Sequence, residues 1–103
     1  MNPEYDKDGY VTEETLEKIE NWPVNKRGLL DFVVNAWDQH YGKIERFQTE
    51  RGTLKWHMAL ITGGWSDNEA IFSSFSRNPA FAIYWVSSHR GGRHVVEDFT
   101  MEG

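Results

Sequence analysis

The stretch FAIYWVSSHRGGRHVVEDF, residues 81–99, decides the fold. Aromatic and β-branched side chains fill residues 81–88, and the same kind of run resumes at residues 94–99. Between the two runs stands Arg90-Gly91-Gly92-Arg93. Two adjacent glycines are typical of a two-residue hairpin turn, because they accept the positive φ angles that such a turn needs. We therefore expect a β-hairpin whose turn is Gly91-Gly92.

Two further strands are expected upstream. Residues 44–48 favour a short strand, and residues 54–62 alternate more clearly. In an extended chain this alternation places Leu54, Trp56, Met58 and Leu60 on one face and Lys55, His57, Ala59 and Ile61 on the other. The intervening Thr-Glu-Arg-Gly, residues 49–52, suits a hairpin turn.

Three helices complete the pattern. Thr12 is the expected N-cap of a helix that runs to about residue 21. A stronger helix is expected over residues 26–41, with Gly42 as its C-terminal cap, because apolar residues recur there at spacings of three and four. A third helix is expected from Ser66 to about residue 78, since Ser66 and Glu69 have the spacing of a capping box.

The resulting order, α-α-β-β-α-β-β, predicts an α+β fold with one antiparallel sheet and helices packed on one face. A chain of 103 residues fits a single domain, residues 1–103, of which the acidic residues 1–10 could be a flexible segment. The absence of cysteine excludes disulfides and thiolate chemistry. Without a signal-peptide pattern or a long apolar run, we expect a soluble, cytoplasmic protein with no membrane partner.

Charge is concentrated at the N-terminal end. Residues 1–22 carry seven acids against two lysines, which accounts for the whole net charge of −5. Among these acids Glu13, Glu14 and Glu17 share one side of the first predicted helix. They are the first candidate binding residues, and an acidic surface of this kind favours a basic partner and repels nucleic acid.

Two other sequence patterns resemble ligand sites. With Gly9 at the sixth position of a calcium loop, Glu4, Asp6 and Asp8 fall on ligand positions, but Thr15 stands where the bidentate glutamate is needed. We therefore predict an acidic turn and no calcium site. The second pattern, residues 63–69, is a glycine-rich turn before a helix; capping explains Ser66 and Glu69, while Trp65 beside two glycines is a candidate functional residue.

The hairpin tip is the other candidate site, and it comprises His89, Arg90, Arg93 and His94. In a two-residue turn Arg90 lies opposite Arg93 and His89 opposite His94. Facing arginines do not stabilise a hairpin, so one interpretation is an anion-binding tip. The other, a solvated turn, is favoured because exposed charges cost little.

Catalytic and cofactor patterns are not found. Two histidines beside arginines are too few for a zinc site, and no serine stands in a nucleophile elbow. We therefore predict a protein that is not an enzyme and that holds no metal and no cofactor. A small enzyme built on the turn at residues 63–69 remains the least favoured alternative.

Three segments carry a resemblance to a known group. The resemblance to small phage and mobile-element proteins lies in residues 8–16, in the Gly-Gly-Trp-Ser turn at residues 63–69 and in the Trp-Val-Ser-Ser-His-Arg-Gly-Gly run at residues 85–92. The resemblance implies an origin and carries no activity. Members of that group have an aromatic pair after the Gly-Gly turn, where this chain has Arg93 and His94, so a role for the tip is not carried over.

These observations lead to one function and one alternative. We expect a non-enzymatic binding protein of phage or mobile-element origin, acting in the host cytoplasm, that occludes or modulates a host macromolecule and could inhibit a defence system. Its partner would be a host protein bound through the acidic face. The alternative is a nucleic-acid-binding module that uses the tip arginines and Trp65.

Overall fold

The computed structural model describes residues 3–49 and 55–98. Helix α1 spans Glu13–Glu20, and its N-cap is Thr12, as predicted. The Thr12 side-chain oxygen accepts a hydrogen bond from the Thr15 N–H at 3.3 Å. Glu13 and Glu14 lie in the first turn, where negative charge stabilises the positive end of the helix dipole.

Helix α2 spans Leu29–Ala36 and is shorter than the predicted helix over residues 26–41. Gly28 precedes it in the left-handed conformation, with φ of 100°, so the helix cannot begin earlier. Trp37 ends it in an extended conformation, and the indole N–H donates to the Ile61 carbonyl at 3.1 Å. The predicted cap at Gly42 is therefore wrong: Gly42 lies against the Ile61 carbonyl, where a Cβ atom would collide.

The four strands form one antiparallel sheet. β1 spans Lys43–Thr49, β2 spans Lys55–Ile61, β3 spans Trp85–His89 and β4 spans Arg93–Glu97. Their order in the sheet is β1-β2-β4-β3. The turn predicted at residues 49–52 lies, beyond Thr49, outside the described residues. The α+β class and the α-α-β-β-α-β-β order are confirmed, with one short helix added.

That added helix replaces half of a predicted strand. Helix α3 spans Ser66–Arg77, and α4, Phe81–Tyr84, follows it after Pro79. The prediction of a strand over residues 81–88 is therefore wrong for its first four residues, which form α4. Phe81 packs edge-on against Phe72 and Phe75, with ring centroids 5.5 and 5.0 Å apart, so aromatic packing on α3 takes precedence over strand propensity here.

The start of α3 also differs from the prediction. Its N-cap is Trp65, and no side chain caps it, so the Ser66–Glu69 capping box is wrong. The backbone closes the turn instead. The Trp65 N–H donates to the Thr62 carbonyl at 3.2 Å, and the Glu69 N–H donates to the Trp65 carbonyl at 3.0 Å.

The β3–β4 hairpin has a three-residue loop, not the predicted two-residue turn. His89 pairs with Arg93, and Ser88 pairs with His94. Arg90 therefore lies in the loop and does not face Arg93, and His89 does not face His94. Gly91 and Gly92 both have positive φ, of 85° and 75°, which is the property that the sequence had indicated.

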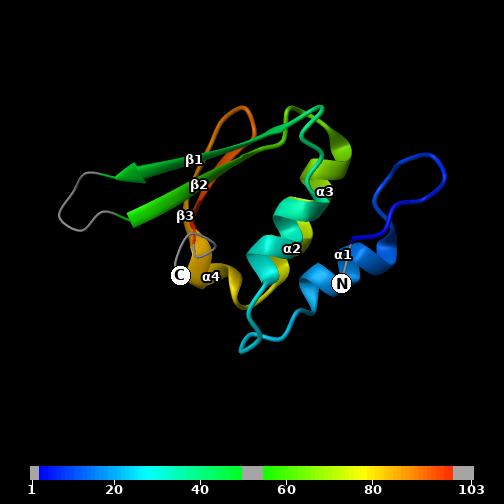
Figure 1. The fold of residues 1–103 in the computed structure, drawn as a ribbon, viewed down its shortest axis with the longest axis horizontal. Helices are drawn as coiled ribbons and strands as arrows, with labels where there is room; N and C mark the ends of the chain where they lie inside the picture. The colour runs from blue at the N-terminus through cyan, green and yellow to red at the C-terminus, as the bar shows by residue number, and fades with distance from the viewer. Residues whose placement is uncertain (1–2, 50–54, 99–103) are drawn as a thin grey trace.

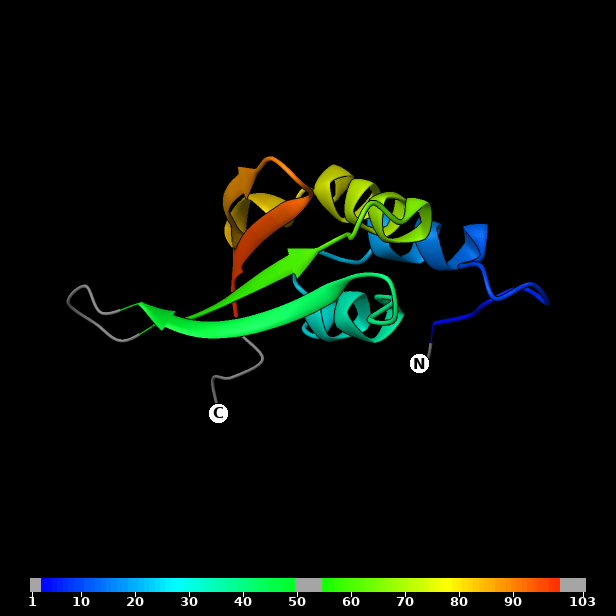
Figure 2. The ribbon, with the colours of Figure 1, turned by 90° about the horizontal axis from the view of Figure 1, so that it is seen from above.

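The helices pack on one face of the sheet. Met58, Leu60 and Val96, which share that face, join the core formed with the helices. Ala59 and Val95 on the opposite face are buried too, but they lie outside this core cluster. Figures 1 and 2 show α1, α2 and α3 gathered toward one end of the molecule and α4 beside β3, while the β1–β2 hairpin extends toward the other end.

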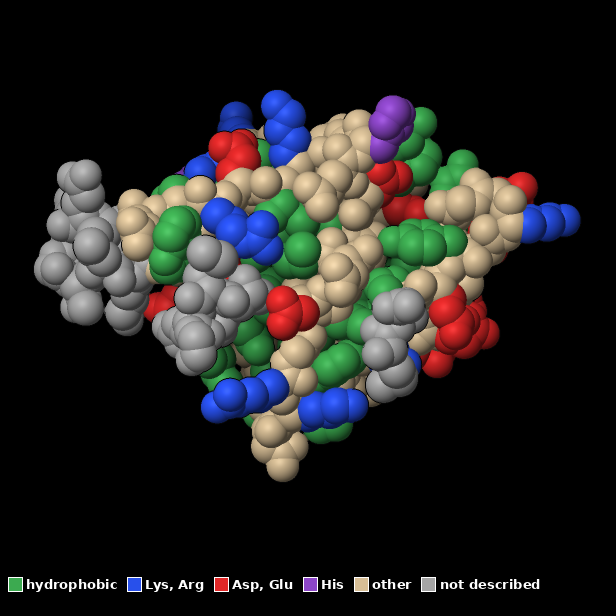
Figure 3. Space-filling view, in the orientation of Figure 1, with side chains coloured by type: hydrophobic (Ala, Val, Ile, Leu, Met, Phe, Trp, Pro, Cys, Tyr) green, Lys and Arg blue, Asp and Glu red, His purple; other side chains and the backbone are tan. Residues whose placement is uncertain are grey.

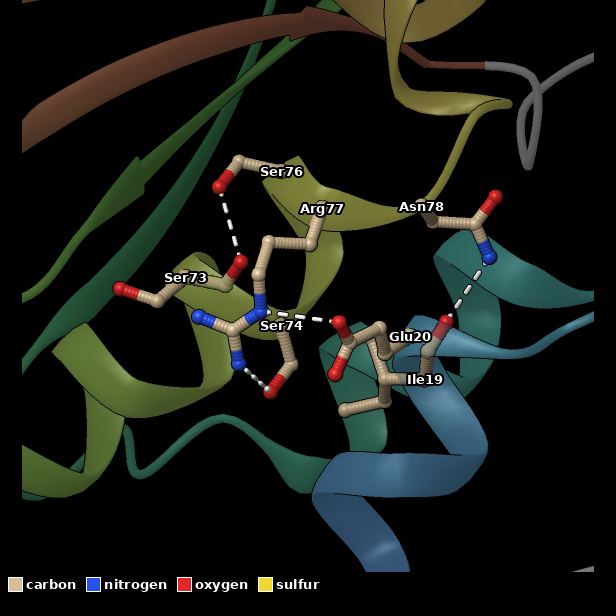
Figure 4. Close-up of polar contacts among 7 residues, drawn as sticks. All are labelled: Ile19, Glu20, Ser73, Ser74, Ser76, Arg77 and Asn78. Atoms are coloured by element: carbon tan, nitrogen blue, oxygen red, sulfur yellow. Dashed lines mark hydrogen bonds and ion pairs between the residues drawn. The ribbon is translucent and has the colours of Figure 1, made fainter.

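Helices α1 and α3 run in the same direction, side by side. Asp67 at the start of α3 accepts a hydrogen bond from the Val11 N–H at 2.8 Å. At the other end, the buried Asn78 amide donates to the Ile19 carbonyl at 2.9 Å, as Figure 4 shows, and to the Trp22 carbonyl at 3.0 Å. The N-termini of both helices therefore lie together.

The two edges of the sheet differ in chemistry. Along β1 the exposed side chains include Lys43, Glu45 and Arg46. β3 contains no acid, lysine or arginine, and its Trp85 and Val86 side chains are 47% and 42% exposed. Charges on an edge strand discourage pairing with another chain, so only β1 is protected in this way.

Candidate functional site

Three aromatic rings from three separate loops stack on one another at the N-terminal end of α3. The Trp65 ring lies 4.4 Å from the Tyr41 ring and 5.8 Å from the Tyr10 ring, with interplanar angles of 23° and 18°. Tyr10 and Tyr41 remain 44% and 55% exposed. We call Tyr10, Tyr41 and Trp65 the aromatic platform. The His40 ring meets Tyr41 edge-on at 4.8 Å.

Asn68, which is fully buried, holds two of the loops that carry the platform. Its side-chain oxygen accepts from the Asp38 N–H at 2.8 Å. Its amide donates to the Asp38 carbonyl at 2.9 Å and to the Thr62 carbonyl at 3.2 Å. A single side chain thus fixes the loop before β1, where Tyr41 lies, against the turn before α3, where Trp65 lies.

Gly63 and Asp67 complete the arrangement. Gly63 has φ of 67°, and a Cβ atom there would collide with the Tyr41 carbonyl, so the two loops touch through their backbones. Asp67 holds the N-terminal turn through Val11, next to Tyr10. The platform is therefore held by contacts from the first turn of α3 and the glycine before it, and does not depend on ring stacking alone.

Two carboxylates, those of Asp38 and Asp67, lie near the N-terminal turn that carries Tyr10. Tyr5 pairs with Val11 across the N-terminal turn and donates its phenol to the Ala36 carbonyl at 2.8 Å. Burial raises the pKa of Tyr5, and the negative charges of Asp38 and Asp67 raise it further. Both carboxylates belong to the loops that carry or fix the platform.

The predicted acidic face lies on α1. Glu13, Glu14 and Glu17 are all exposed. Glu14 also lines a shallow hollow with Glu4, Thr15, Lys18 and Phe32. Its space of about 220 Å³, part of it open solvent, is below the size typical of a small-molecule site. In Figure 3 acidic side chains gather on the right of the molecule, toward the N-terminal loop.

The hairpin tip lies beside the turn that carries Trp65. The Thr62 N–H donates to the Gly92 carbonyl at 3.0 Å. The structure therefore brings together two segments that the sequence analysis treated as separate candidates. Arg90 is exposed in the loop, and Arg93 places its guanidinium 5.7 Å from the centre of the Phe47 ring, on the sheet.

The two tip histidines bond to neighbouring serines. His94 Nδ1 lies 2.8 Å from Ser88 Oγ, and His89 Nε2 lies 2.9 Å from Ser87 Oγ. The His94 ring also stacks on Phe72 at 3.6 Å. Partial burial lowers the pKa of His94, although the nearby Glu69 charge acts in the opposite direction. These contacts account for His94 as a packed residue of the hairpin.

The sequence analysis singled out Trp65 but missed its two tyrosine partners. Tyr41 is the last residue of the helix predicted over residues 26–41, and Tyr10 lies outside every predicted helix and strand. No periodic pattern relates three rings that lie on three loops. The signal that existed was local: an aromatic residue next to Gly9 and another next to Gly42, at turns where apolar rings have no helix or strand to pack on.

Within residues 3–49 and 55–98, no group of three histidine, aspartate or glutamate side chains could hold a metal ion. No helix in this part of the chain has the length and hydrophobicity to cross a bilayer. Comparison with known proteins found no matching family model, curated protein or solved structure.

Proposed function

We propose that this chain is a non-enzymatic binding protein of phage or mobile-element origin, acting in the host cytoplasm, whose acidic N-terminal end occludes a basic host protein. The observation that carries the proposal is the exposure of Glu13, Glu14 and Glu17 on α1, beside an N-terminal loop that adds Glu4, Asp6 and Asp8, all exposed. Charges gathered on one surface steer a partner of opposite sign and speed its association.

The arrangement of α1 favours this use of its acids. The helix buries Thr15 and Ile19, and Glu13, Glu14 and Glu17 lie away from those positions. Glu13 and Glu17 lie one turn apart on the helix, with Glu14 beside Glu13, so the three side chains form one negative patch. Like charges so placed destabilise a helix slightly, and binding a basic surface would relieve that repulsion. Inhibition of a host defence system is one role that such occlusion would serve.

The test is charge reversal of this patch. Pull-down from host lysate with mass spectrometry identifies the partner, and association kinetics at two salt concentrations measure its binding. The variant Glu13→Lys, Glu14→Lys, Glu17→Lys is expected to abolish binding, with a loss of association rate that is largest at low salt. The fold should survive, because the three side chains are exposed.

A matched pair of double variants provides the control. Glu13→Lys with Glu17→Lys changes the net charge as much as Asp31→Lys with Glu45→Lys, and both pairs are exposed. Only the first pair is expected to weaken binding strongly. Equal losses would show that net charge alone matters. Tight DNA or RNA binding in a gel shift, lost on Arg90→Ala with Arg93→Ala, would favour the nucleic-acid alternative and contradict the proposal.

A further inference from the structure

The aromatic platform is not explained by the stability of the fold. Tyr10, Tyr41 and Trp65 are absent from the hydrophobic core, and two of the rings are about half exposed. The Trp65 indole N–H is buried without a hydrogen-bond partner among the described residues. A buried donor without a partner destabilises the folded state, so an aliphatic residue would suit a purely structural role better.

We propose that the aromatic platform binds an arginine side chain of the basic partner, packed against the aromatic surface that Tyr10 and Tyr41 leave exposed. This inference rests on the proposed function, and it adds the chemistry of the residue that is recognised. Exposed aromatic rings attract cations through the negative charge on their faces, and the attraction is strongest when the cation loses its water.

The charges around the platform favour a cation over a nucleobase. Asp38 and Asp67 act on the phenol of Tyr5, in the same turn as Tyr10. Asp6 and Asp8 are exposed on that turn as well, and with one lysine, Lys7, between them these three residues are net negative. Single-stranded nucleic acid also stacks on aromatic rings, but its phosphates would meet these carboxylates. A positively charged side chain is attracted by both the aromatic rings and the carboxylates.

Arginine suits the platform better than lysine. The guanidinium group is flat and weakly hydrated, so it stacks on a ring face while its edge remains free for hydrogen bonds to carboxylates. The lysine ammonium is compact and strongly hydrated, and it interacts mainly as a point charge. The platform should therefore favour arginine over lysine through its rings.

The platform is pre-formed, which favours binding. Asn68, Asp67 and Gly63 fix the loops through backbone contacts, so the rings need little ordering when a ligand arrives. Ordering side chains at an interface opposes binding, and a pre-organised site avoids much of that entropy loss.

The test uses two fluorescently labelled peptides, hexa-arginine and hexa-lysine, titrated against the full chain by anisotropy at low salt. The wild type is expected to bind hexa-arginine roughly 2- to 30-fold more tightly, the range that cation–π energies allow. Tyr10→Leu with Tyr41→Leu keeps apolar cover over Trp65 and removes the π faces. This variant should lose the arginine preference and keep its affinity for hexa-lysine.

The conservative variant Tyr10→Phe with Tyr41→Phe is the matched control. It retains the rings, so it should retain the arginine preference. Thermal melts of both variants establish that they are folded. The proposal is overturned if the wild type binds the two peptides equally or binds neither, or if the leucine variant keeps the preference. It is also overturned if the wild type binds an oligothymidine and the leucine substitutions abolish that binding.

The same titrations separate this inference from the proposed function. Charge reversal of Glu13, Glu14 and Glu17 should weaken the binding of both peptides by the same factor and leave the preference for hexa-arginine unchanged. If charge reversal does not change the affinity for either peptide while the leucine variant loses its preference for hexa-arginine, the proposed role of the acidic face is contradicted and that of the platform is supported. If the reversal weakens both peptides but the leucine variant behaves as wild type, the platform fails and the acidic face stands.

Discussion

Two buried asparagines frame helix α3, and each binds backbone groups from distant segments. Asn68 near its start bonds the backbone of Asp38 and Thr62. Asn78 at its end bonds the backbone of Ile19, Trp22 and Ala80. Amide side chains suit this task because each carries both a donor and an acceptor. Loop positions in this protein therefore depend on single buried polar residues more than on loop sequence.

One threonine, Thr12, and one serine, Ser66, test the assignment of the N-caps of α1 and α3. Thr12→Ala should destabilise the protein by about 1 kcal/mol, because it removes the observed cap of α1. Ser66→Ala should change stability by less than about 0.5 kcal/mol, because Ser66 is exposed and caps nothing. Urea denaturation of both variants measures the difference. A Ser66→Ala loss as large as that of Thr12→Ala would contradict the assignment of the α3 cap to the backbone.

At the scale of the elements, the sequence predicted the type of every helix and strand except α4. Periodicity and prolines were sufficient for α1 and α3, and alternation was sufficient for β1 and β2. The bounds of α2 could not be predicted, because Asn68, 30 residues away, binds Asp38 and draws the chain out of the helix before Tyr41. α4 was missed because its formation depends on packing against α3.

The candidate site was predictable in part for the same reason. The acids of α1 follow from local sequence, and the structure leaves Glu13, Glu14 and Glu17 exposed as a surface helix requires. Trp65 was noticed through its glycines. The stack with Tyr10 and Tyr41 depends on contacts between loops that lie far apart in sequence, and no local pattern encodes those contacts.

The glycines of the β3–β4 loop make a prediction at the same scale. A Cβ atom on Gly91 would lie in open space, whereas a Cβ atom on Gly92 would collide with the Thr62 hydroxyl. Gly91→Ala should therefore cost about 1–2 kcal/mol, from positive φ alone. Gly92→Ala should cost about 1–3 kcal/mol more, because Thr62 is buried and cannot move aside freely. Equal losses in thermal or urea unfolding would contradict the close approach of the loop to Thr62.

At the scale of the whole molecule, the acidic end and the β1–β2 hairpin lie at opposite ends of the long axis (Figures 1 and 2). The helices lie between them, on one face of the sheet. A partner bound at the N-terminal end would therefore meet the starts of α1 and α3 together, and with them the aromatic platform. The parallel course of these two helices brings the turn before α1, with Tyr10, against the start of α3, with Trp65.

The unequal edges of the sheet have a consequence for how copies of this protein can assemble. A sheet with two open edges can add copies without limit and form a fibre, whereas a sheet with one open edge closes on itself after one addition. Because β1 carries charges and β3 does not, any association through sheet edges should stop at a dimer. Sedimentation velocity at rising concentration should show no species larger than two chains, and Trp85→Lys should remove the dimer. Lys43→Val with Glu45→Val should open the second edge and allow longer assemblies. The charges on β1 alone would then decide whether the protein stops at a dimer or forms a fibre.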